Sequence, residues 1–239
     1  MRRGLSACLA SALLAGFVAG PLAAQTSPVV PENYDTLARE LPGLVSFDTL
    51  PPVPEPGHLI DGLYRAPGAL IGERFMGQTL LTARDAQNNR FDAFGGDVST
   101  PLQPVPGGPG QSLAIAQHRG FGSMAAFPLG PRGYPDVAAL GEGALAVLFE
   151  ADQAALGLRL HAEYEDPLGA RPLPGIATLT FYDRSGQVIG VQIIGLHYGP
   201  QDIGVRFPDK NCAAFTLTTK DPGGIAVDDI LYSLAYASS

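Results

Sequence analysis

Two adjacent aspartates near the C-terminus have the clearest chemical potential, because they interrupt an apolar stretch that is typical of a buried strand. Read as a strand, residues 225–232 place Asp228 and Asp229 on opposite faces. Asp229 then shares its face with Ile225, Val227 and Leu231, and Asp228 shares the other with Ala226, Ile230 and Tyr232. Burying an ionised carboxylate is costly unless it is paired, hydrogen-bonded or bound to a metal. Either one aspartate reaches solvent while the other accepts backbone N–H groups, or the pair contributes to a Ca²⁺ site.

A third carboxylate can join this pair from the start of the chain. Asp48 lies in the middle of Leu44–Leu50, which has the composition of a strand. Because the two ends of a domain often lie close together, this opening strand and the closing strand are expected to be neighbours. Converging carboxylates repel one another, and a cation would resolve that conflict. We therefore predict a structural calcium site formed by Asp48, Asp228 and Asp229.

Other polar residues offer weaker patterns. The histidines at positions 58, 118, 161 and 197 are far apart, and no two have the spacing of a metal pair. Glu163, Glu165 and Asp166 could supply a carboxylate pair for glycoside hydrolysis, or form a solvated strand end. No P-loop, HExxH or CxxC motif is present. We therefore predict no catalytic site and no cofactor besides calcium.

Short strands must position these residues. Period-2 alternation is clearest in Leu156–Ala162, where the leucines share one face and Arg159 and His161 the other. Asp183–Gly186 is typical of a hairpin turn between two strands. Residues 84–111 predict long loops with at most one short strand near Phe91. Helical periodicity is confined to Asn33–Leu41. Further strands are expected at 58–64, 77–83, 112–117, 144–150, 156–164, 177–183, 187–195, 203–207, 213–219 and 225–234. This pattern indicates an all-β antiparallel sandwich with a short N-terminal helix and long loops.

The N-terminus predicts export. Arg2 and Arg3 precede an apolar run from Leu5 to Ala19, and small residues at 23–24 offer a cleavage point, as in a secretory signal peptide. The apolar run is shorter than the roughly 20 residues that span a bilayer. We predict a signal peptide at 1–24, a leader with a short helix at 25–43, and a single sandwich domain at 44–236. Only Cys212 follows the signal, so an internal disulfide is excluded.

Composition limits the partners. The 239-residue chain has 15 basic and 23 acidic residues, and removal of residues 1–24 would leave 13 basic against 23 acidic. A nucleic-acid binder needs clustered positive charge, so that class is excluded. No second apolar run of 18 residues exists, so we expect no membrane span after signal removal. A chain of this length can form one well-buried domain.

Three segments carry a family resemblance. Gly223–Ile230 is similar to the closing strand of secreted bacterial jelly-roll modules associated with PEP-CTERM sorting tails, and of MAM domains. Val45–Leu50 resembles their opening strand, and Ala177–Gly190 their central hairpin. The resemblance extends over roughly residues 44–234. It implies a jelly-roll, galactose-binding-like or concanavalin-like sandwich, in which Asp48, Asp228 and Asp229 would be metal ligands near the terminal strands.

These observations favour a secreted, non-catalytic binding module. The expected partner is an extracellular glycan or cell-surface component, in the periplasm or outside the cell. One alternative is a structural envelope or matrix protein without a small ligand, and a jelly-roll hydrolase is a third. The chain has no tryptophan, the residue that most often stacks on sugars.

Overall fold

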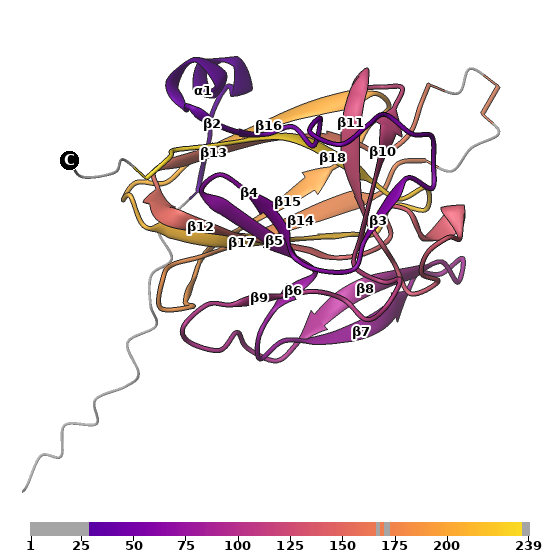
Figure 1. Ribbon diagram of the computed structural model, residues 1–239, viewed down its shortest axis with the longest axis horizontal. Coiled ribbons are helices and arrows are strands. Elements are labelled where there is room, and N and C mark those ends of the chain that lie inside the picture. The colour runs from indigo at the N-terminus through magenta and orange to yellow at the C-terminus, as the bar shows by residue number, and fades with distance from the viewer. Residues whose placement is uncertain (1–28, 166–167, 170–172, 236–239) are drawn as a thin grey trace, which may run out of the picture.

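Alternating apolar residues build two antiparallel sheets that face one another in the computed structural model (Figure 1), which describes residues 29–165, 168–169 and 173–235. The predicted signal peptide, 1–24, lies outside the described residues. The fold is therefore the all-β antiparallel sandwich that the sequence predicts. No helix among the described residues has both the length and the apolar character that crossing a bilayer requires.

The first sheet has eight strands, in the order β1-β16-β13-β18-β11-β10-β3, with β2 also paired to β18. Their bounds are β1 Val30–Pro31, β2 Gly43–Val45, β3 His58–Ile60, β10 Leu113–His118, β11 Ser123–Pro128, β13 Ala155–His161, β16 Pro200–Arg206 and β18 Ala226–Tyr232. The second sheet has six strands, in the order β15-β14-β17-β12-β5-β4. Their bounds are β4 Tyr64–Ala66, β5 Ala69–Gly72, β12 Leu145–Gln153, β14 Ile176–Tyr182, β15 Val188–Gly195 and β17 Cys212–Thr219.

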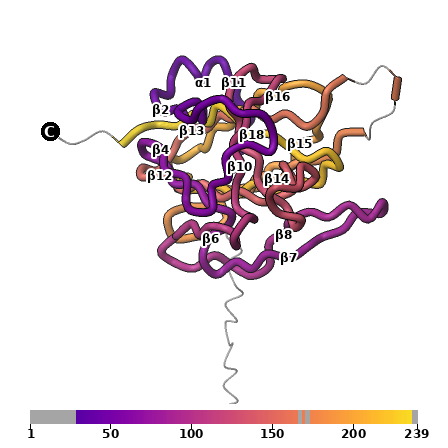
Figure 2. The backbone as a smooth tube through the Cα atoms, turned by 45° about the vertical axis from the view of Figure 1, so that its right-hand side comes forward, coloured from indigo at the N-terminus to yellow at the C-terminus, as the bar shows by residue number. Residues whose placement is uncertain are grey.

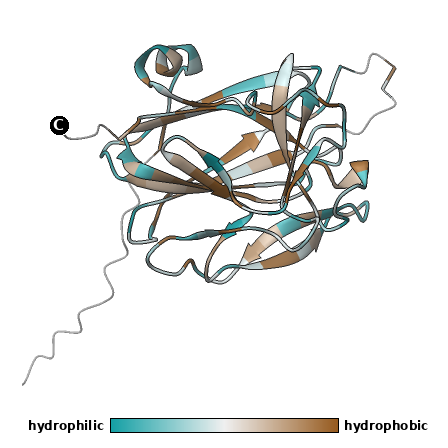
Figure 3. Cartoon of the chain, in the orientation of Figure 1, coloured by the Kyte–Doolittle hydropathy of each residue, from teal (hydrophilic) through white to brown (hydrophobic). Residues whose placement is uncertain are grey.

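The main core fills the space between the two sheets, where hydrophobic residues gather (Figure 3). On β13, Leu156, Leu158 and Leu160 point into this core, as their alternation predicts. Phe149 of β12 and Tyr232 of β18 meet across it, with ring centroids 5.2 Å apart. Each large buried apolar side chain contributes about 1.5–3 kcal/mol relative to an exposed one.

The outer faces of both sheets are also partly covered. On the second sheet, two short paired strands, β6 (Arg74–Phe75) and β9 (Pro104–Val105), bring Phe75 over Ala146 and Ala214. On the first sheet, helix α1 (Tyr34–Glu40), capped by Asn33, packs Leu37 against Ala155. The segment 129–140 covers another part of that sheet and includes the 3₁₀ helix η1 (Val137–Ala139). Polar residues on these outer faces can therefore be buried.

A hairpin joins the strand predicted at 77–83 to the start of the region that the sequence predicts as mostly loop. β7 (Thr79–Arg84) pairs along its whole length with β8 (Arg90–Gly95), and the hairpin projects from the body of the molecule (Figure 2). Its turn is held by the Asp85 carboxylate, which accepts hydrogen bonds from the backbone N–H groups of Gln87 and Asn89. β7 matches the strand predicted at 77–83, and β8 matches the short strand expected near Phe91, whereas the two-residue strand β9 is one more than the sequence predicts for 84–111. The pairing of β7 with β8 is not predicted, because this side-chain turn has no Gly or Pro to mark it.

The faces of the closing strand differ from simple alternation. Val227 points into the core, but so do Ile230 and Tyr232. The register against β13 shifts between Asp228 and Leu231, and Asp229 has a positive φ of 48°. Asp229 is thus the extra residue of a β-bulge, which reverses the faces after it. The predicted grouping of Asp228 with Ile230 and Tyr232 is wrong for this reason.

We predict that Gly141→Ala strongly destabilises the fold. Gly141 has φ +77°, and a Cβ there would clash with the backbone N and O of Ile225, at the entry to β18. The left-handed conformation costs about 1–2 kcal/mol for a residue with a side chain, and overpacking adds about 1–3 kcal/mol. Gly122→Ala is a matched control, since Gly122 has the same φ and open space around it. Urea unfolding should show a clearly larger loss for Gly141→Ala, and equal losses would contradict the steric argument.

Candidate functional site

The structure brings Asp48, Asp228 and Asp229 together. On the edge opposite β13, β18 pairs with β11 at Val227 and then with β2 from Ile230 onward. Asp48 follows β2, and its Oδ1 accepts a hydrogen bond from the N–H of Met124 at the start of β11 (2.9 Å). The opening and closing strands are therefore neighbours, and the three carboxylates lie near the point where β18 changes partner. The prediction that Asp48 lies in mid-strand is wrong, because β2 ends at Val45 and Phe47 turns the chain with a positive φ of 57°, which places Asp48 in a turn.

Protein groups already contact each of these carboxylates. Asp228 is fully buried, and accepts hydrogen bonds from the Ser123 hydroxyl (2.6 Å) and the Asp229 N–H (2.8 Å). Asp229 forms an ion pair with Arg159 (3.2 Å). Burial, together with the neighbouring charges of Asp229 and Asp48, raises the pKa of Asp228 to about 7, against the hydrogen bonds from Ser123 and the Asp229 N–H.

These contacts agree with the first alternative from the sequence, in which hydrogen bonds, and not a metal ion, stabilise the buried aspartate. Arg159, which also pairs with Asp202 (2.9 Å), supplies positive charge at the place where a cation was expected. Within the described ranges, no group of three or more His, Cys, Asp or Glu side chains is arranged to hold a metal ion. Calcium at Asp48, Asp228 and Asp229 stays a prediction.

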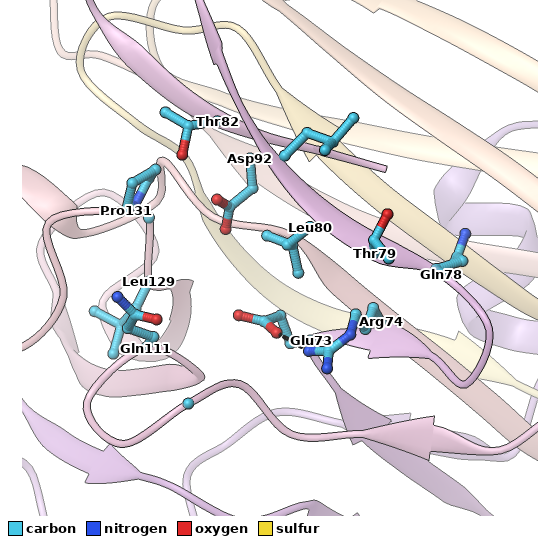
Figure 4. Close-up of a pocket in the computed structure, with 13 residues that line it drawn as sticks. Glu73, Arg74, Gln78, Thr79, Leu80, Thr82, Asp92, Gln111, Leu129 and Pro131 are labelled. Carbon is cyan, nitrogen blue, oxygen red and sulfur yellow. Dashed lines mark hydrogen bonds and ion pairs between the residues drawn. The ribbon is translucent and has the colours of Figure 1, made fainter. Parts of the chain in front are cut away.

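A polar cleft of about 430 Å³ lies elsewhere, beside the β7–β8 hairpin (Figure 4). Glu73 and Arg74 enter it from the start of β6, and Asp92 enters it from β8. In Figure 4 the carboxylates of Glu73 and Asp92 face the same hollow from opposite sides, with Leu80 between them. Further lining is provided by Thr79, Thr82, Gln111, Leu129 and Pro131.

Backbone contacts fix the two acidic residues. The N–H of Glu73 donates to the Val105 carbonyl on β9 (2.9 Å), and the N–H of Asp92 donates to the Glu142 carbonyl (3.1 Å). The Glu73 side chain forms an ion pair with Arg74. The hairpin and the short β6–β9 pair therefore set the separation between the two carboxyl groups.

Burial makes these carboxyl groups hard to ionise. Glu73, Asp92 and the nearby Glu142 are each only 5–6% exposed. Burial raises the pKa of Asp92 to about 7, and the charges of Glu73 and Glu142 add to the rise. Burial also raises the pKa of Glu73, against the attraction of Arg74. Near neutral pH the cleft thus offers a carboxyl group that both donates and accepts hydrogen bonds, a paired carboxylate and a guanidinium.

Sequence reasoning missed these residues. Glu73 follows the apolar run Ala69–Gly72, and Asp92 stands between Phe91 and Ala93, in the short strand expected near Phe91. A charged residue beside apolar neighbours is the available signal, and it is the signal that identifies Asp228 and Asp229. It does not bring Asp92 next to Glu73, because the pairing of β7 with β8 is not visible in the sequence.

Comparison of the chain with protein-family models, curated proteins and solved structures found no match. Function is therefore inferred from the chemistry of the described side chains.

A melting-temperature series with added Ca²⁺ and with EDTA tests the calcium prediction. An ion bound to the native state alone raises the melting temperature as its concentration increases. We expect a calcium site at the three aspartates to produce that rise, and Asp228→Ala to abolish it. A melting temperature that responds to neither Ca²⁺ nor EDTA would contradict the calcium prediction. The hydrogen bonds and the ion pair with Arg159 would then be the interactions that stabilise the three aspartates.

The raised pKa of Asp92 predicts a pH-dependent stability. The native state keeps a proton on Asp92 that the unfolded chain releases near pH 3.8, so this stabilising contribution is complete only below about pH 3.8 and is lost progressively until the pH has risen through about 7. Asp92→Asn should therefore differ little from the unmodified protein near pH 3.8, and be more stable at pH 8 by about 1–3 kcal/mol. Asp97→Asn, at an exposed position after the hairpin, is the control. Equal urea midpoints for Asp92→Asn and the unmodified protein at pH 8 would refute the assignment.

Proposed function

We propose that this protein is a secreted β-sandwich binding module that takes a sugar unit of an extracellular glycan in the cleft beside the β7–β8 hairpin. The observation that carries the proposal is the pair of buried acidic side chains, Glu73 and Asp92, facing one hollow next to the guanidinium of Arg74. The signal-like N-terminus supports export to a compartment where glycans are displayed.

Carbohydrate is the ligand class that this lining suits. Each sugar hydroxyl both donates and accepts hydrogen bonds, and carboxyl, guanidinium, amide and hydroxyl groups in the cleft can match them. Leu80 and Pro131 provide apolar surface for the C–H faces of a sugar ring. The cleft has no aromatic residue in its lining, so recognition would depend on these polar contacts.

Glycoside hydrolysis is the second candidate, because the two carboxyl groups have different surroundings. Asp92, with its pKa raised to about 7, can hold a proton for a leaving group, while Glu73 is paired with Arg74. Two carboxyl groups in different protonation states are what acid-catalysed cleavage of a glycosidic bond requires. An envelope or matrix protein without a small ligand is the remaining alternative.

Glycan-array binding of the purified protein tests the proposal. We expect binding to a defined set of glycans, and at least a tenfold loss of affinity for Glu73→Gln, since a charge-assisted hydrogen bond contributes about 1.5–3 kcal/mol. Glu150→Gln, at an exposed position on β12, is the matched control and should bind normally. Melting curves of both variants separate a lost contact from a lost fold. Absence of binding to every glycan on the array would overturn the proposal and favour an envelope or matrix protein without a small ligand.

Product analysis on the bound glycans separates binding from hydrolysis. A hydrolase would release new reducing ends, and Asp92→Asn would stop their release while leaving binding largely intact, because the amide has nearly the same shape as the protonated carboxyl group. Binding without the release of new reducing ends would contradict hydrolysis and support the non-catalytic binding module.

A further inference from the structure

Two histidines that are far apart in the sequence meet on the outer face of the first sheet. His118 ends β10 and His161 ends β13, and their ring centroids are 4.5 Å apart. Tyr164 lies beside both rings, 4.4 Å from that of His161 and 5.9 Å from that of His118. These three residues line a hollow of about 390 Å³, here called the histidine pocket.

Hydrogen bonds to other protein groups hold His118 and Tyr164 in the wall of this pocket. The N–H of Phe121 donates to Nδ1 of His118 (3.2 Å), so the neutral ring carries its proton on Nε2. That Nε2 lies 3.4 Å from the Tyr164 hydroxyl oxygen, which also accepts from the N–H of Gly120 (3.2 Å). A protonated Nε2 cannot ligate a metal ion, so the two histidines are not a metal pair.

His161 lacks such a partner. It is only 2% exposed, and its Nε2 has no hydrogen-bond partner among the described residues. Burial lowers its pKa, against the pull of the Glu163 carboxylate, so the ring is neutral near pH 7. A buried polar atom without a partner is rare in a native protein and costs about 1–3 kcal/mol. A group that enters the pocket and bonds to this nitrogen would recover that cost.

Arg119 supplies positive charge at the mouth of the pocket. Its guanidinium carbon lies 4.1 Å from the centre of the Tyr164 ring, and the side chain has no ion pair among the described residues. Arg119 also lines a neighbouring hollow with Pro52 and Val53. A guanidinium positioned over an aromatic ring can bind a carboxylate through two parallel hydrogen bonds.

The remaining lining restricts the charge and shape of a ligand. Glu55 and Glu163 also line the pocket, so a polyanion would be repelled, whereas one negative charge beside Arg119 is favoured. Phe127 and Leu140, from the cluster on the outer face of the sheet, provide an apolar surface. A single carboxylate, a neighbouring hydroxyl and a C–H face are the features of a sugar acid.

We propose that the histidine pocket binds a sugar acid, with its carboxylate on Arg119 and one hydroxyl on Nε2 of His161. None of the residues that carry this proposal lines the cleft beside the β7–β8 hairpin, so variants can test the two sites separately.

Calorimetric titration with glucuronate and galacturonate, and with glucose as the neutral comparison, tests this proposal on the full chain. We expect at least one of the two acids to bind, and glucose to bind at least about tenfold more weakly, because it lacks the charge-assisted hydrogen bonds. Arg119→Gln should weaken binding of the acid by about tenfold or more, and so should His161→Gln. Arg65→Gln and His197→Gln, at exposed positions elsewhere, are the matched controls.

Arg119 is exposed, so its variant keeps the test valid even if His161→Gln fails to fold. Nitrogen NMR of the imidazoles gives an independent readout, since the proposal predicts that the His161 Nε2 resonance shifts on addition of the acid while that of His197 does not. Glu73→Gln should leave binding of the acid unchanged, which separates this site from the cleft. Absence of binding by both acids, equal binding of glucose, or unchanged affinity in Arg119→Gln would each overturn the proposal.

Discussion

The structure depends on one strand, β18, which must stay paired on both edges while its partner on one edge changes from β11 to β2. A strand in the middle of a sheet cannot leave backbone groups unpaired without losing the free energy of those hydrogen bonds. The bulge at Asp229 takes up the change of partner, and it keeps Val227, Ile230 and Tyr232 on the core side. The carboxylates of Asp48 and Asp228 accept N–H groups at the same point, so these acids complete the pairing of the sheet.

Both candidate sites arise from a second constraint, the covering of the outer faces of the sandwich. A side chain on the outside of a sheet normally meets water, but here loops and a hairpin lie over part of each face. Polar residues under these covers lose hydration, and their preferred charge state changes with it. Asp92, on strand β8 of the covering hairpin, and His161, beneath the 119–122 turn, are the two clearest cases. The segment 129–140 contributes to the lining of both hollows, so its position affects both.

Local patterns were enough to predict much of the fold. Helix α1, the alternation along β13, the hairpin turn at 183–186 and the approach of Asp48 to the closing strand all agree with the structure. The failures concern information that is not local. The bulge at Asp229 depends on which strands flank β18, and the meeting of His118 with His161 depends on the order of four strands in the sheet. The cleft required the β7–β8 hairpin, whose turn is closed by the Asp85 side chain in place of a glycine or proline.

The buried titratable groups together favour a particular pH range for the fold. Burial raises the pKa of Asp92, Glu142 and Asp228 to about 7, so their stabilising protonated forms are lost as the pH rises through that value. Burial lowers the pKa of His118 to about 4 and also that of His161, so the unfolded chain takes up protons first as the pH falls below about 6.5. The buried carboxyl groups therefore lower the stability of the fold as the pH rises, and the buried imidazoles lower it as the pH falls. Because both kinds of group are neutral in the native state between these limits, mildly acidic conditions are those in which none of these five side chains has to be buried with a charge.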